Sequence, residues 1–137
     1  MNNTNEFLPS NVVPIRKSEK FGVYTGVVTS SGEVIEGESV GVAYLKTGSK
    51  KFRLKLFTHP ITQYFVVPDE TNNERYLVLS LEEYQVSTGE MKSSWYRVGE
   101  GKLVGSFIAL RIQLLSESLF LCLFPEKPER MEDSIAS

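Results

Sequence analysis

The residues that could do chemistry are concentrated in one strongly basic stretch. Between positions 46 and 55 there are five positive charges and no acidic residue: Lys46, Lys50, Lys51, Arg53 and Lys55. The last three alternate with apolar residues, so in a β-strand they would share one face. A row of cations on a strand face can follow a phosphate backbone, and each neutralised phosphate adds salt-sensitive affinity. The pattern therefore indicates a nucleic-acid-binding face.

Aromatic residues on the neighbouring strand candidates could complete this face. Tyr44 precedes the basic stretch, and Tyr64 and Phe65 follow it. Single-strand binders built on β-barrels stack bases on aromatic side chains beside a basic groove. We therefore predict a site for single-stranded nucleic acid made of the five cations with Tyr44 and Tyr64. The alternative is that the lysines form a solvated strand face or protect an edge strand from aggregation.

Patterns that would support catalysis or metal binding are weak in this chain. The one histidine, His59, stands before Pro60 and has no cysteine partners for a zinc site of the usual kind. Paired carboxylates can hydrolyse glycosidic bonds when a fold sets their separation, but the pairs here lie beside turn signals. They are Glu36/Glu38, Asp69/Glu70 and Glu82/Glu83. No nucleophile elbow or phosphate loop occurs, so we predict a non-enzymatic protein without catalytic residues, metal or cofactor.

A second hypothesis is a protein–protein interface or an assembly role. Trp95, Tyr96 and Phe107 are large apolar residues that an antiparallel sheet could expose together, and aromatic residues are enriched at such interfaces. An exposed strand edge could also bind a partner strand, including one from a second copy of the chain. We keep this reading beside the nucleic-acid one.

Composition bounds these hypotheses. The chain has 137 residues and a formal net charge of -2, so any polyanion would have to be held by a local patch. Its single cysteine, Cys122, lies in an apolar run, which favours a buried thiol and is compatible with the cytoplasm. No apolar run is long enough to span a membrane, and the first six residues lack the apolar core of a secretory signal. We predict a cytoplasmic protein.

The dominant hydrophobic period is two, which indicates strands separated by short turns and therefore an all-β barrel or sandwich. We expect strands at 21–29, 34–36, 40–46, 51–56, 62–67, 75–80, 84–86, 91–98, 106–114 and 118–124. A helical turn at 80–83 is an alternative, because Ser80 and Glu83 have the spacing of a capping box. An irregular arm (1–19) and an acidic tail (126–137) flank the predicted β-domain (20–125).

The chain matches itself when it is shifted by 57 residues, which predicts two copies of one β-module, 20–68 and 77–125. The matches gather at turns: Ser30–Glu33 falls on Ser87–Glu90, Gly48–Ser49 on Gly105–Ser106, and Pro68 on Pro125. The copies differ on one face, because Phe107, Ala109 and Arg111 stand where the first copy has its cations. Recurrence of Gly and Ser at unrelated hairpins is the alternative explanation.

Residues 41–67 carry a resemblance to a known group. The run from Gly41 to Lys46, a glycine-containing turn, and the run from Phe52 to Leu56 resemble small uncharacterised all-β proteins encoded on plasmids and phages. Members of that group often have Trp where Tyr44 stands. The resemblance carries over no site residue and implies a bacterial or phage accessory protein.

Overall fold

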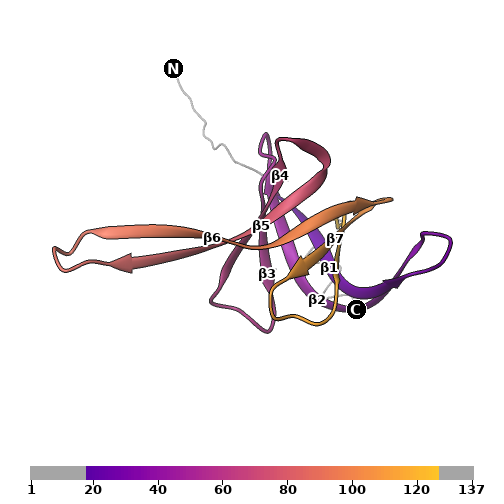
Figure 1. Ribbon diagram of the computed structural model, residues 1–137, viewed down its shortest axis with the longest axis horizontal. Coiled ribbons are helices and arrows are strands. Elements are labelled where there is room, and N and C mark those ends of the chain that lie inside the picture. The colour runs from indigo at the N-terminus through magenta and orange to yellow at the C-terminus, as the bar shows by residue number, and fades with distance from the viewer. Residues whose placement is uncertain (1–17, 127–137) are drawn as a thin grey trace, which may run out of the picture.

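Antiparallel strands connected in sequence order close into a barrel (Figure 1). The computed structural model describes residues 18–126, and every regular element in that range is a strand. The strands are β1 (Ser18–Val28), β2 (Val34–Lys46), β3 (Phe52–Leu56), β4 (Gln63–Asp69), β5 (Asn72–Gln85), β6 (Met91–Val104), β7 (Phe107–Ile112) and β8 (Leu119–Cys122). Pairing of β8 with β1 closes the barrel. The all-β prediction is confirmed, and the architecture is a barrel.

The barrel interior is one apolar core. In β3 the side chains alternate between buried and exposed, so that Phe52, Leu54 and Leu56 point inward while Arg53 and Lys55 point outward. This is the alternation expected of a sheet with one face in the core. The core residues are Phe21, Val23, Ala43, Phe52, Leu54, Leu56, Tyr64, Val66, Val78, Ile108, Leu110, Ile112, Leu119 and Leu121.

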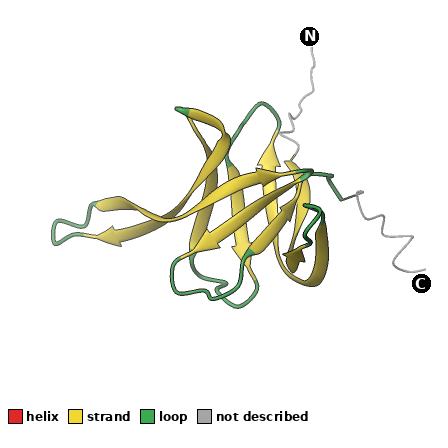
Figure 2. Ribbon diagram, turned by 45° about the vertical axis from the view of Figure 1, so that its right-hand side comes forward, coloured by secondary structure: helices red, strands yellow, loops and turns green. Residues whose placement is uncertain are grey.

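One hairpin projects from the barrel as a two-stranded ribbon. Strand β5 pairs with β4 as far as Leu81, and β6 pairs with β7 only from Gly99 onward. Residues 82–94 therefore pair only within their own hairpin and extend away from the barrel (Figures 1 and 2), whereas residues 95–97 at its root pair with residues 79–81 of the barrel wall. We call residues 82–98 the arm.

The β1–β2 hairpin bends more than the arm does. Its register shifts twice, between Val23 and Tyr24 and between Tyr24 and Gly26, whereas the β5–β6 pair shifts once, between Val78 and Leu79. Each shift marks a bulge or irregularity, and bulges bend and twist a strand pair. The additional shift gives a physical reason for the curled β1–β2 hairpin in Figure 1 and the extended arm.

The bent hairpin covers part of the outer surface of β8. Phe120 lies between the inward-facing Leu119 and Leu121, so its side chain points away from the core, yet it is only 2% exposed. The backbone near Gly26 lies against its ring, since a Cβ built there would be 3.3 Å from the ring. The ring of Phe107 also packs on it, with centroids 6.4 Å apart. These contacts bury aromatic surface outside the barrel.

The two halves of the barrel have matching turns. In the first hairpin Gly32 N–H donates to Thr29 O, and Thr29 N–H donates to Glu33 O. The same two bonds recur 57 residues later, where Gly89 N–H donates to Val86 O and Val86 N–H donates to Glu90 O. Gly32 and Gly89 both have φ near +90°, a conformation that glycine adopts without steric cost. These geometries are what the 57-residue shift leads one to expect. A common origin of the halves stays a prediction.

Several boundaries differ from the sequence predictions. Residues 80–83 belong to β5, so the helical turn does not form, and 34–46 is one strand rather than two. Strand β7 ends at Ile112, where 106–114 was expected, and β5 begins at Asn72, three residues before the predicted strand at 75–80. Cys122 is half-buried on the outer side of β8 rather than buried. Strand β1 begins inside the N-terminal segment 1–19 that was predicted to be irregular. The rest of that segment and positions 127–137 lie outside the described residues.

We expect the core, rather than exposed apolar residues, to hold the fold. Ile108→Ala deletes a side chain that is 0% exposed and should lower the free energy of unfolding by about 2–5 kcal/mol. The same substitution at Ile61, which is 92% exposed, should change it by less than about 0.5 kcal/mol. Urea denaturation followed by circular dichroism measures both. Equal losses for the two variants would contradict this assignment of the core.

Candidate nucleic-acid interface

The predicted basic face forms one side of a surface groove. The groove has a volume of about 620 Å³ and is lined by Ser18, Tyr44, Lys46, Ser49, Lys51, Arg53 and Phe65. The register of the strands explains why these side chains lie together, because Arg53 on β3 lies opposite Tyr44 on β2 and opposite Phe65 on β4. Paired residues share a face of a sheet, so the three side chains form an outward-facing row. Four of the predicted residues, Tyr44, Lys46, Lys51 and Arg53, are therefore brought together.

A cation–π cluster lies at one border of the groove. The Lys51 ammonium is 5.1 Å from the centroid of the Phe65 ring and 5.6 Å from that of the Trp95 ring. The two rings are 5.2 Å apart and inclined at 58°. Phe65 belongs to the barrel wall and Trp95 to the arm, so this cluster joins the arm to the basic groove. A cation at this distance from an aromatic face is attracted by the ring quadrupole.

The groove keeps its positive charge because carboxylates lie elsewhere. No Asp or Glu lines it, and within residues 18–126 the ion pairs involve other cations: Lys20–Glu126, Arg75–Glu100 and Arg97–Glu100. Glu36 is ten residues before Lys46 on β2, on the order of 30 Å away along the strand. Two carboxylates border the site: Glu126 contacts Lys20, which lies opposite Tyr44, and Glu83 accepts a hydrogen bond from Gln63, two residues before Phe65 on β4. Lys50 and Lys55 are exposed near the groove but do not line it.

The prediction for Tyr64 is wrong. Its side chain is 7% exposed and belongs to the barrel core, because β4 turns Tyr64 inward and Phe65 outward. Burial raises the pKa of the Tyr64 hydroxyl, against a smaller lowering by a hydrogen bond with Thr62. The hydroxyl lies 3.1 Å from Nδ1 of His59, and it donates to that nitrogen when the imidazole carries its proton on Nε2. His59 thus has a structural partner, and Phe65 takes the aromatic position expected of Tyr64.

The three residues predicted as a protein interface do not form one patch. Trp95 packs on Phe65, whereas the hydroxyl of Tyr96, the next residue along β6, donates to Glu82 Oε1. Phe107 packs on Phe120 and lies opposite Val104, which is nine residues after Trp95 on β6. Successive residues of a strand point to opposite faces, which separates Trp95 from Tyr96. Sequence reasoning therefore placed Trp95 in a different site from the one in which the structure finds it.

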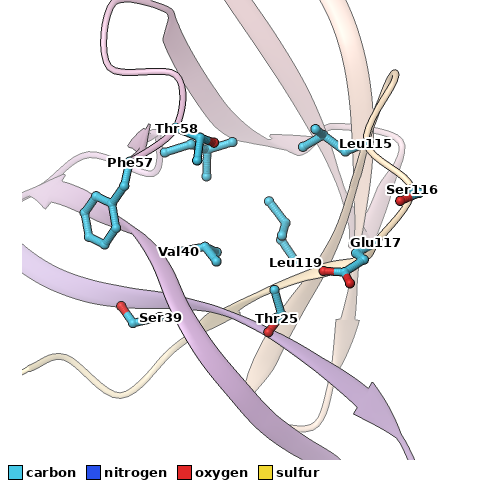
Figure 3. Close-up of a pocket in the computed structure, with 10 residues that line it drawn as sticks. Thr25, Ser39, Val40, Phe57, Thr58, Leu115, Ser116, Glu117 and Leu119 are labelled. Carbon is cyan, nitrogen blue, oxygen red and sulfur yellow. The ribbon is translucent and has the colours of Figure 1, made fainter.

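A second cavity opens at one end of the barrel (Figure 3). It has a volume of about 290 Å³ and lies between β1, β2 and the loops that follow β3 and β7. Its lining residues are Thr25, Ser39, Val40, Leu56, Phe57, Thr58, Leu115, Ser116, Glu117 and Leu119. Glu117 is the one acidic or basic side chain among them, so this barrel-end pocket has no acid–base pair.

Neither the other features of residues 18–126 nor the comparisons with known proteins assign a function to the chain. Residues 18–126 contain no group of three or more His, Cys, Asp or Glu side chains placed to hold a metal ion. In the same range no helix is long and apolar enough to cross a membrane. No family model, no curated protein and no solved structure matches the chain.

The loop beside the barrel-end pocket holds a strained residue. Leu114 has φ +72° with its side chain fully exposed, and the left-handed region costs an ordinary residue about 1–2 kcal/mol. Asparagine tolerates this region better than leucine or alanine. We expect Leu114→Asn to be more stable than Leu114→Ala by up to about 1 kcal/mol in urea denaturation. Both variants lose the exposed side chain, so equal stabilities would mean that the backbone is not strained there.

Proposed function

We propose that the protein is a non-enzymatic module that binds nucleic acid by its phosphate backbone. The observation that supports this is the groove in which Lys46, Lys51 and Arg53 meet two aromatic side chains without a carboxylate in the lining. The net charge of -2 gives no general attraction for polyanions, so binding would depend on this local patch.

The geometry sets the expected strength of the salt dependence. Three cations line the groove, and each contact with a phosphate of a single strand lowers the slope of log K against log salt by about 0.7. A strand that follows all three should therefore give a slope of about −2. Lys50 and Lys55 would steepen it if the strand extends beyond the groove.

We predict that Arg53→Gln weakens binding of a fluorescein-labelled oligo(dT) of about 16 nucleotides and makes the slope shallower by about 0.7. The matched control is Arg111→Gln, which removes an exposed arginine from the outer face of β7. Fluorescence anisotropy from about 50 to 200 mM salt measures both variants. An unchanged slope for Arg53→Gln, or no binding by the wild type at the lowest salt, would contradict the proposal.

A second candidate function is protein binding at the barrel end, and the distribution of exposed apolar residues favours it. A neighbouring depression of about 630 Å³ shares Thr25 and Glu117 with the barrel-end pocket. Large exposed hydrophobic residues line or border the two: Val27, Val28, Ile35, Phe57 and Leu114. Glu117 lines both depressions and Glu36 lines the neighbouring one, and no other charged residue is in either lining. The complementary occupant is an apolar segment of a partner protein that carries a lysine or arginine.

Two peptides that differ in one charge test this candidate. An acetylated Leu-Leu-Lys-Leu peptide should shift the amide NMR signals of Leu115 and Leu119, and a Leu-Leu-Glu-Leu peptide should not. Glu117→Gln should reduce the affinity for the lysine peptide, because it removes a carboxylate that lines both depressions. Equal shifts with both peptides would contradict the assigned charge complementarity. The plasmid or phage origin and the cytoplasmic location stay predictions.

A further inference from the structure

Trp95 lies close enough to the basic groove for its side chain to contact a base of a strand bound there. It is the only tryptophan of the chain and is 47% exposed at the root of the arm. Leu81, opposite Trp95 in the arm, is also the residue of β5 that pairs with Gln63 of β4. The register therefore places the indole beside the outer face of the barrel wall, where it contacts Phe65.

The contrast with the other hairpin shows why this aromatic surface stays accessible. Phe120 on β8 and Phe65 on β4 both point outward from the last strand of a barrel half. The bent β1–β2 hairpin buries Phe120, whereas the extended arm leaves Phe65 half-buried and Trp95 about half exposed. At this second place the ammonium of Lys51, the end of a flexible side chain, lies over both rings.

We infer that an unpaired base stacks against Trp95, that Lys51 moves from the two rings to a neighbouring phosphate, and that the groove is therefore selective for single-stranded nucleic acid. This inference rests on the proposed function, because the phosphate contacts bring the strand to the groove. A mobile lysine is suited to the exchange, since its ammonium can leave an exposed ring for a phosphate that carries a full charge.

Selectivity for single strands follows from the geometry of stacking. In a duplex both faces of an internal base are covered by its neighbours, so stacking on an indole requires the base to be unpaired and turned outward first. In a single strand the bases are already unpaired, so the free-energy cost of turning one outward is small. Base–aromatic stacking tolerates every base, so we expect weak sequence preference.

The single tryptophan makes stacking directly observable in the wild-type protein. Addition of oligo(dT) should quench the Trp95 fluorescence, and a hairpin duplex of equal charge should bind more weakly and quench less. Trp95→Leu should weaken oligo(dT) binding about ten-fold or more by anisotropy, whereas Trp95→Tyr, which keeps an aromatic face, should retain most of the affinity. The matched control is Tyr96→Leu, at the adjacent half-exposed position on the opposite face, which should bind as the wild type does.

Lys51→Met separates the phosphate contact of Lys51 from the stacking of a base on Trp95. It should make the salt slope shallower by about 0.7 and leave the quenching at saturation unchanged, because the phosphate contact is lost and the stack is kept. Salt-dependent binding that is equal for duplex and oligo(dT), without quenching and without an effect of Trp95→Leu, would overturn the inference and leave the phosphate proposal standing. Absence of binding to either nucleic acid at low salt would overturn both. If Trp95→Leu does not fold, the quenching and duplex measurements on the wild type decide.

Discussion

Closure of the barrel is the constraint on which the other features depend. Once β8 pairs with β1, through Val23 opposite Leu121, every strand of the wall has an inner and an outer face, and alternate residues must go to each. The inner set packs into one apolar core, so a shift of any strand by one residue would exchange core and surface. The register that the core enforces also decides which outward side chains become neighbours. The groove is a product of that register.

The difference between the two halves has a structural cause beyond their different residues. Both halves place an aromatic side chain on the outer face of their last strand, Phe65 and Phe120. In one case a hairpin with two register shifts folds against it, and in the other a hairpin with one shift extends away. A covered face needs apolar contacts, such as that of Phe107 with Phe120, whereas an open face can carry cations. The basic groove and the straight arm thus occur together.

The molecule also separates its charges and its exposed apolar surface. The cations of the groove gather around the end of β2 near Lys46, and Glu36, Glu38 and the apolar residues of the bent hairpin lie toward its other end. This separation keeps Glu36 and Glu38 away from the groove. It also gives the barrel end a different chemistry, apolar with Glu117 between its two depressions. The two surfaces therefore differ in both charge and polarity.

The sequence by itself determined the all-β class, the inner and outer faces of β3, the turn glycines and the collection of cations, because period two and turn chemistry are local properties. It did not determine the bounds of the strands, since 34–46 is one strand rather than two. It did not determine the phase of β4: Tyr64 and Phe65 are adjacent aromatic residues, and only pairing with β3 turns the first inward. It also did not place Trp95, which lies thirty residues from Phe65 and reaches it through the pairing of β4, β5 and β6. Such neighbours depend on register between strands, and register is settled by the packing of the whole core.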